Sequence, residues 1–399
     1  MRSDQAKALV LPASAASFVA GGGRDVALGA LPEAARAGLG AGDHVRIADE
    51  RGAEVGLGVV DPDNDKVRVL AVAADGFPRI DGALLGWRVE RALALRARLG
   101  LTGPDRAYRL VHGAGDGLPG FACDVLGRTC VVYAYAEALR PLGRQLAEAI
   151  VGFARLEGAV VKLRARGGES AVAQDVVGAK PADEVIATES GVPYELHPLA
   201  GLNHGLFTDM REHRLGLARF AAGARVLNLF SYTGALGLAC ARAGAASVVS
   251  VDTSAGVQAW ARGNFARSGL APNDARWRFE TGDAARFLAR AARDKERYDL
   301  VIVDPPSTSS AAGGSGWVLA RDYPALIAKA AAVIPPDGLL WLAANTQDLT
   351  SLGKLAHKGL REAGRTGAIL EQGGLPPEYP TLAAQPADRY LQVCLLRLA

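Results

Sequence analysis

The sequence has little of several features that would identify its class directly. It contains only four cysteines, and they form neither a C-x-x-C pair nor a cysteine and histidine pattern typical of a metal site: Cys123, Cys130, Cys240 and Cys394. No window reaches the roughly 18 uninterrupted apolar residues of a membrane span, because Lys329 interrupts the best candidate, residues 327–334. We therefore expect reduced thiols in a soluble cytoplasmic protein, with no cysteine-based metal site and no membrane association.

An excess of charge of one sign is also absent. The 45 lysines and arginines against 42 aspartates and glutamates give a net charge of +3, and the pI is near 8.7. This balance is compatible with a polyanionic partner but equally with an ordinary soluble enzyme. At 399 residues the chain is too long for one typical domain, so two or three compact units are expected.

The first two predicted domains differ in their periodicity. Short β-type runs separated by glycine and aspartate turns predict a small barrel over residues 1–78, and we interpret the apolar stretch 8–20 as an opening strand rather than a signal peptide. Residues 79–197 mix strands with two helices, near 84–99 and 138–154, which predicts an α+β unit. The arginines along the first of these helices are expected to be solvated: Arg88, Arg91, Arg96 and Arg98.

Residues 198–399 alternate regularly between apolar strands and amphipathic helices. Strands are expected at 225–230, 247–252, 276–280, 298–303 and 338–343, with a final edge strand at 390–398, and helices at 234–243, 254–268, 284–292, 320–334 and 349–363. Strands that are apolar on both faces and joined by helices predict an α/β fold, with a parallel sheet covered by helices on each side.

Ligands of such sheets bind beyond the carboxyl ends of the strands, so the polar residues there are candidates. The first candidate group follows Asn228 and comprises Phe230, Ser231, Tyr232, Thr233 and Gly234. Backbone amides at the start of the next helix can meet a carboxylate, and glycine permits close approach. Because this loop lacks the G-x-G-x-x-G pattern of dinucleotide sites, a dehydrogenase is disfavoured.

Three further strand ends carry acids. Asp252, followed by Thr253 and Ser254, can accept two ribose hydroxyls, or it can cap the next helix. Asp283, followed by Ala284, can accept an exocyclic amine of adenine, or it can be a plain helix cap.

The last of these acids is Asp304, which is followed by Pro305 and Pro306. Each proline locks φ and donates no backbone hydrogen bond. The result is a stiff, polar-edged turn that can hold a flat ring, unless its role is purely architectural.

In order and spacing these residues resemble the Rossmann-like class of S-adenosylmethionine-dependent methyltransferases. Residues 226–234 (VLNLFSYTG), 207–214 (FTDMREHR) and 304–306 (DPP) resemble the bacterial large-subunit ribosomal RNA methyltransferase I and K group. The resemblance implies S-adenosylmethionine as cofactor, with Asp209 and Arg211 against its pocket and the 230–234 turn around its methionine moiety.

The resemblance extends over nearly the whole chain. Residues 42–70 resemble the amino-terminal PUA domain of the family, and residues 108–120 resemble its central domain. It therefore implies a PUA-like barrel that binds RNA (1–78), a central domain (79–197) and a Rossmann-like methyltransferase domain (198–399), acting on ribosomal RNA. A homodimer is kept open.

The methylated atom depends on whether a thiol reaches the base. Methylation of cytosine carbon 5 requires a cysteine thiolate that adds at carbon 6. In the cytosine-modifying members of the family this cysteine stands where the present chain has Ala344-Asn345-Thr346-Gln347, and no cysteine follows Pro306. The sequence DPPSTS (304–309), with Asn345 in the later turn, resembles the guanine-N7 branch of the family, whose turn also carries asparagine and no cysteine. This resemblance implies that Asp304 and Pro305 orient the base and that Asn345 or Gln347 reads its edge.

Three alternatives stay open at this stage. They are a cytosine-C5 enzyme with an unidentified cysteine, an RNA assembly factor that binds the cofactor without turnover, and a small-molecule methyltransferase. The chain also departs from the family at residues 201–205, where we expect His204 to be solvated.

Overall fold

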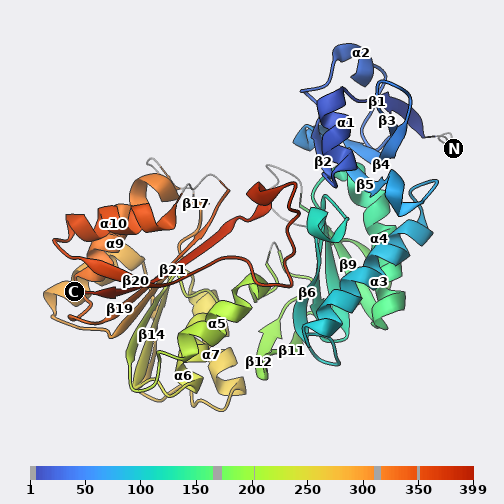
Figure 1. Ribbon diagram of the computed structural model, residues 1–399. Helices are drawn as coiled ribbons and strands as arrows, with labels where there is room; N and C mark the ends of the chain where they lie inside the picture. The colour runs from blue at the N-terminus through green and yellow to red at the C-terminus, as the bar shows by residue number, and fades with distance from the viewer. Residues whose placement is uncertain (1–5, 165–172, 202, 310–315, 348–350) are drawn as a thin grey trace. The chain divides into compact units, whose positions relative to one another are not determined.

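The structure, a computed structural model, describes residues 6–164, 173–201, 203–309, 316–347 and 351–399 (Figure 1). The chain divides into two compact units. The first unit comprises Met1–Glu189, Leu196–His204 and Pro377–Asp388, and the second comprises Ser190–Glu195, Gly205–Pro376 and Arg389–Ala399. None of the described helices is both long and apolar enough to cross a bilayer.

The first unit begins with a five-stranded sheet in the order β1-β3-β4-β5-β2. Its strands are β1 (Lys7–Val10), β2 (Asp25–Ala27), β3 (His44–Ala48), β4 (Glu54–Asp61) and β5 (Lys66–Val72). Helices α1 (Ala13–Ala20) and α2 (Glu33–Arg36) connect them. The prediction of a strand over residues 8–20 was wrong beyond Val10, because Pro12 cannot donate to a ladder and its φ of −55° favours the start of the alanine-rich helix α1.

A second five-stranded sheet of this unit has the order β10-β9-β8-β7-β6. It contains β6 (Ala107–His112), β7 (Phe121–Leu126), β8 (Thr129–Ala134), β9 (Gly158–Leu163) and β10 (Ala173–Gly178), together with helices α3 (Gly82–Arg98) and α4 (Arg140–Ala154). The apolar faces of both helices and of this sheet form one core. Two short strands, β11 (Val185–Glu189) and β12 (Val192–Leu196), follow along the chain.

Two of the four arginines of α3 are buried, which contradicts the prediction that they are solvated. The Arg96 side chain is 0% exposed and makes a bidentate pair with Asp116 at 2.6 and 2.8 Å, while Arg88 pairs with Asp75 at 2.5 Å. Burial of a guanidinium is tolerated because a carboxylate accompanies each one. A helical pattern alone does not reveal such partners, which come from distant segments.

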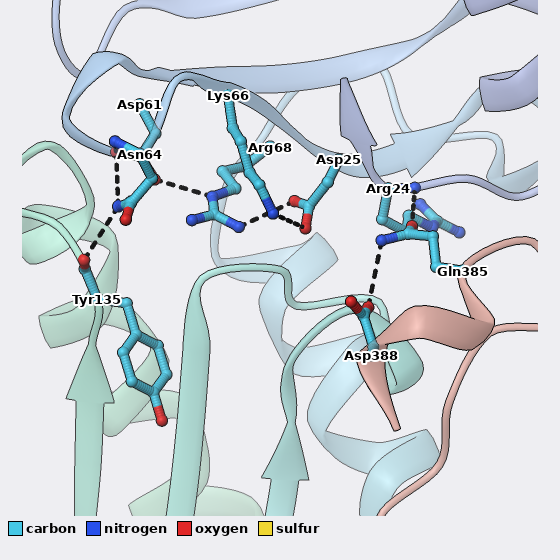
Figure 2. Close-up of polar contacts among 9 residues, drawn as sticks. All are labelled: Arg24, Asp25, Asp61, Asn64, Lys66, Arg68, Tyr135, Gln385 and Asp388. Atoms are coloured by element: carbon cyan, nitrogen blue, oxygen red, sulfur yellow. Dashed lines mark hydrogen bonds and ion pairs between the residues drawn. The ribbon is translucent and has the colours of Figure 1, made fainter. Parts of the chain in front are cut away.

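Polar contacts join the amino-terminal sheet to the rest of the first unit (Figure 2). Arg68 bonds Asp61 at 2.8 Å and Asp25 at 3.0 Å, with all three side chains nearly buried. Asn64 donates to the Tyr135 carbonyl at 3.2 Å, and Gln385 accepts from the Arg24 amide at 2.6 Å. The sheet, the α+β part and residues 377–388 are therefore tied together by specific hydrogen bonds.

The second unit contains a seven-stranded sheet in the order β15-β14-β13-β16-β19-β21-β20. The mutually parallel strands are β13 (Arg225–Leu229), β14 (Ser247–Asp252), β15 (Trp277–Thr281), β16 (Leu300–Val303) and β19 (Leu339–Asn345). Strand β21 (Leu391–Leu398) is antiparallel to β19, and β20 (Gly367–Gly373) is antiparallel to β21. At this end of the sheet the edge strand is therefore β20 and not the 390–398 run, which was predicted to lie at the edge. The chain order reverses between β13 and β16, which is where ligands of open α/β sheets bind. The predicted α/β fold is confirmed for this unit.

All helices of the second unit except the first lie close to their predicted positions. The helices are α5 (Arg211–Ala218), α6 (Ala235–Arg242), α7 (Ala255–Arg267), α8 (Ala284–Arg293), α9 (Leu319–Ala331) and α10 (Leu352–Glu362), and a small hairpin pairs β17 (Thr308–Ser309) with β18 (Trp317–Val318). Helix α5 and strand β20 were not anticipated. Strand β20 is exposed along its whole length, so its sequence carries no alternation of apolar and polar residues.

Candidate active site

A cleft of about 340 Å³ lies in the second unit, at the carboxyl ends of the strands. This volume is within the ordinary range of small-molecule sites. The predicted residues that line it are Asp209, Phe230, Ser231, Tyr232, Thr233, Asp252, Thr253, Asp304, Pro305 and Asn345. The fold thus brings together residues from three of the four strand ends singled out in the sequence, together with Asn345.

The turn between β13 and α6 has an unusual backbone. Phe230 and Tyr232 have φ values of 56° and 47°, and Gly234 has 80°, so two residues with side chains occupy the left-handed region. A Cβ at Gly234 would lie 3.0 Å from the Cβ of Ala261, which explains why glycine stands there. Thr233 donates its hydroxyl to the Gly205 carbonyl at 2.7 Å and helps to hold the turn. Strain of this kind is typical of a functional loop held by its surroundings.

Asp252 is fixed by backbone amides on both of its oxygens. The Tyr232 amide donates to Oδ2 at 3.0 Å and the Ser254 amide donates to Oδ1 at 3.1 Å. Helix α7 is capped by Ser254 itself, whose hydroxyl accepts from the Val257 amide at 3.3 Å. The carboxylate is therefore held at the wall of the cleft by the turn and does not act as the helix cap.

Asp304 faces a second acid. Asp209 lies in the short 3-10 helix Thr208–Met210 and is almost buried, with the Tyr390 hydroxyl donating to its Oδ2 at 2.9 Å. Burial, and next the charge of Asp209, raise the pKa of Asp304 to about 7, while the buried guanidinium of Arg214 opposes this shift. Asp304 therefore gains or loses its proton near neutral pH, and acids with a pKa shifted by burial and a neighbouring charge often occur at functional sites.

The turn after Asp304 is anchored to its neighbours. The Trp317 indole donates to the Pro306 carbonyl at 2.8 Å, and the Ser307 hydroxyl donates to the carbonyl of Asn345. Pro305, Pro306 and Asn345 line one part of the cleft. A planar ring can enter between a stiff apolar turn and hydrogen-bonding side chains there.

Several predicted residues do not line the cleft. Asn228 is buried in β13 beneath α6, where a Cβ on Gly237 would lie 3.1 Å from its Nδ2. Gly234 and Ser254 do not line the cleft themselves, but residues next to them in the sequence do. The Arg211 guanidinium pairs with Glu212 at 2.9 Å. Each of these residues is next to the site rather than in it.

Asp283 and Ala284 are also outside the residues that line the cleft. The Asp283 side chain is exposed and accepts from the Arg286 amide at 2.8 Å, which makes it the cap of α8. Ala284 is buried in the core of the unit. The geometry corresponds to the plain helix cap that the sequence left open as the alternative.

The cleft also contains residues that the sequence interpretation did not place in the site. They are Phe207, Met210, Arg214, Ala235, Leu236 and Ser307, and Pro306 lines the cleft as part of the turn that was predicted to hold a flat ring. Three of them belong to the 207–214 segment, and the others lie close in sequence to predicted residues. Extending each motif by a few residues would therefore have included them. Arg214 could not be assigned from sequence because only the folded α5 brings its buried side chain toward the acids.

His204 belongs to the first unit and is buried, at 3% exposed, instead of solvated as predicted. Its Nε2 lies 3.2 Å from Asp124 Oδ2, and Asp124 is also paired with Arg109 at 2.7 Å. The histidine is kept in a buried polar cluster by a carboxylate from strand β7, a partner that sequence spacing does not reveal.

Residues 117–396 match the family model of the S-adenosylmethionine-dependent methyltransferases. The chain belongs to this family. It is 30% identical over 371 residues to the ribosomal RNA large subunit methyltransferase I of Shewanella denitrificans, covering 90% of this chain and 91% of that protein. It is 29% identical to a ribosomal RNA large subunit methyltransferase of Deinococcus radiodurans, with coverage of 90% and 89%. The predicted family resemblance is confirmed.

Solved structures share the fold of this methyltransferase. A protein from Streptococcus mutans assigned as a SAM-dependent methyltransferase superposes with a TM-score of 0.83 at 21% identity, covering 98% of this chain and 100% of that one. A second protein assigned as a methyltransferase, solved in complex with SAH, has the same TM-score and coverage at 22% identity. The agreement extends over both units of the chain.

The cofactor of the family is S-adenosylmethionine, and the cleft of this methyltransferase fits it chemically. Asp252 presents a fixed carboxylate of the kind that accepts ribose hydroxyls, and the strained 230–234 turn leads into the first amides of α6. Phe230 and Leu236 add apolar walls. These residues form one continuous lining with Asp304.

Proposed function

We propose that this enzyme methylates a base of large-subunit ribosomal RNA by direct transfer to a ring nitrogen such as guanine N7. The observation that carries the proposal is a methyltransferase cleft that is lined by acids and an amide but by no thiol. The names of the relatives from Shewanella and Deinococcus support ribosomal RNA as the substrate.

The thiols of the chain argue against covalent chemistry on cytosine. All four cysteines are buried, and none lines the cleft. Burial raises the pKa of Cys240 to about 12 and that of Cys394 to about 11, so both remain protonated at neutral pH. Because the thiolate is the nucleophile that cytosine C5 methylation needs, this route is disfavoured.

The residues of the cleft divide into two groups in this proposal. Asp252 and Thr253 hold the ribose of the cofactor, and the 230–234 turn holds its methionine end. Asp209 supports the cofactor side through its buried carboxylate. S-adenosylmethionine supplies an electrophilic methyl group on a sulfonium.

The second group receives the base. Asp304 accepts a hydrogen bond from an exocyclic amine, Pro305 and Pro306 support the plane of the ring, and Asn345 reads an edge. A ring nitrogen attacks through its own lone pair, so the protein needs to supply orientation rather than a covalent nucleophile.

The first unit provides the RNA contacts in this proposal. We assign RNA binding to the PUA-like sheet of residues 1–78, assisted by the central part, 79–197. Phosphate contacts made by lysine and arginine weaken as salt rises, so RNA affinity should fall steeply with ionic strength. A small-molecule enzyme would show no such dependence.

Two experiments test the function. Labelled S-adenosylmethionine should methylate ribosomal RNA or large subunits from cells that lack this gene, and mass spectrometry of the product should locate one methylated base. Methyl transfer to no form of ribosomal RNA, together with tight cofactor binding, would instead indicate an assembly factor without turnover. A methyl group on cytosine carbon 5 would refute the ring-nitrogen assignment while leaving the RNA substrate intact.

A further inference from the structure

The two turns that meet at the substrate side of the cleft belong to neighbouring strands, β16 and β19. Their registered pairing ends at Val303 and Leu342, immediately before Asp304. Beyond that point, Pro305 and Pro306 have no amide hydrogen, so β16 cannot continue the ladder. Another group must therefore set the spacing between the Asp304 turn and the Asn345 turn.

The hydroxyl of Tyr323 occupies this position. It lies 2.8 Å from the carbonyl oxygen of Val303 and 2.8 Å from that of Ala343, so its one hydrogen is shared between the ends of both strands. The side chain is fully buried and comes from the first turns of α9. Burial, and next the charge of Asp304, raise the pKa of Tyr323, so the hydroxyl remains a donor at neutral pH.

Further contacts strengthen the same junction. The ring of Trp317 lies 6.4 Å from that of Tyr323, edge to face, and its indole nitrogen bonds the Pro306 carbonyl. The Ser307 hydroxyl bonds the carbonyl of Asn345 and closes the link between the two turns. Tyr323 is the buried centre of this arrangement, whereas Trp317 and Ser307 are nearer its surface.

We propose that Tyr323 is a positioning residue for methyl transfer, which holds the Asp304 turn and the Asn345 turn at the spacing that receives the substrate base. The hydroxyl touches neither cofactor nor base; it acts through the carbonyls of Val303 and Ala343. This inference rests on the proposed role of Asp304 and Asn345 in binding the base. Misplacement of reacting groups by ~1 Å can cost ~100-fold in rate, so a small change in spacing is sufficient.

The test compares two tyrosine variants at opposite ends of β16. Tyr323→Phe removes the hydroxyl at the carboxyl end, and Tyr298→Phe removes the hydroxyl of another buried tyrosine, which bonds Glu296, at the amino end. Turnover on ribosomal RNA should fall about tenfold or more in Tyr323→Phe and stay within about twofold in Tyr298→Phe. Affinity for S-adenosylmethionine, measured by calorimetry, should stay within about threefold in both, because Asp252 and its turn are untouched.

Hydrogen exchange supplies a readout that needs no RNA. Peptides covering residues 300–309 and 339–347 should exchange faster in Tyr323→Phe than in Tyr298→Phe, while the peptide around Asp252 should not change. Trp317→Phe, at a less buried position, should shift exchange and turnover in the same direction by a smaller factor.

Three results would overturn the inference: equal turnover in the two tyrosine variants, unchanged exchange of the two turns, or a loss of cofactor affinity as large as the loss of turnover. If Tyr323→Phe does not fold, normal turnover and exchange in Trp317→Phe would also overturn it. Failure of the wild-type enzyme to methylate RNA would instead remove the proposed function, and the exchange comparison would still decide whether Tyr323 controls the two turns.

Discussion

The ends of strands β14 and β16 place the same side chain, an aspartate, in opposite surroundings. Asp252 accepts backbone amides on both oxygens and presents a carboxylate of fixed orientation. Asp304 has no hydrogen-bonding partner within the described part of the chain and instead faces Asp209, which together with burial raises its pKa to about 7. The fixed carboxylate of Asp252 is suited to holding a ligand, whereas Asp304 can change its protonation state when a ligand binds. Both acids nevertheless stand at the ends of apolar strands of similar sequence.

The strongest test of this contrast is Asp304→Asn. The variant keeps the shape of the side chain but removes the acceptor charge, so turnover should fall by about 100-fold, in the range found for positioned groups that act in the transition state. Affinity for S-adenosylmethionine should change by less than about threefold. Single-turnover kinetics and calorimetry measure the two quantities, and an equal loss in both would make Asp304 a structural residue.

Asp252→Ala should have the opposite profile. The Tyr232 and Ser254 amides lose their acceptor and the ribose loses its partner, so cofactor binding should weaken by about 1 to 3 kcal/mol. Asp283→Ala is the matched control, since it removes an exposed helix cap outside the lining of the cleft. It should lower stability by about 1 kcal/mol and leave calorimetric affinity unchanged. Equal losses of S-adenosylmethionine affinity in the two variants would contradict the assignment of Asp252 to the cofactor site and of Asp283 to a helix cap.

The pH dependence of turnover sharpens the comparison further. Asp304 is protonated below its pKa of about 7, so it accepts a hydrogen bond as a carboxylate only above that value, with Asp209 and Arg214 as its charged neighbours. Turnover should rise about tenfold between pH 6 and pH 8, as expected for one ionising group. A rate profile of Asp304→Asn should show no inflection near 7, and persistence of the inflection would assign it to another group.

The smallest expected effect is on stability. Because the folded-state pKa of Asp304 lies above its ordinary value, the stability linked to its proton is fully present below the ordinary pKa and is lost as pH rises through about 7. Asp304→Asn should therefore gain melting temperature relative to wild type as pH increases from 5 to 8. Thermal scans at matched ionic strength measure this difference. A difference in melting temperature that stays constant from pH 5 to pH 8 would contradict the raised pKa of Asp304.

Sequence periodicity predicted the helices and strands of the second unit well where burial leaves a repeating pattern. Strand β14 begins and ends where the apolar run predicts, and the turn 230–234 was located from its residues. Strand β20 escaped because an edge strand exposed along its length shows no alternation. Arg96 and His204 were misjudged because their burial depends on Asp116 and Asp124, which no local pattern connects to them.

By itself the sequence determined the order of elements and the residues at each strand end, because local periodicity, prolines and glycines act over a few positions. Only the tertiary structure decided what those residues do. It set Asp209 and Arg214 against Asp304, fixed Asp252 between two amides, made Asp283 a helix cap, and placed the Tyr323 hydroxyl between two strands. Charge, burial and spacing are properties of groups that meet across long stretches of chain, and folding alone brings them together.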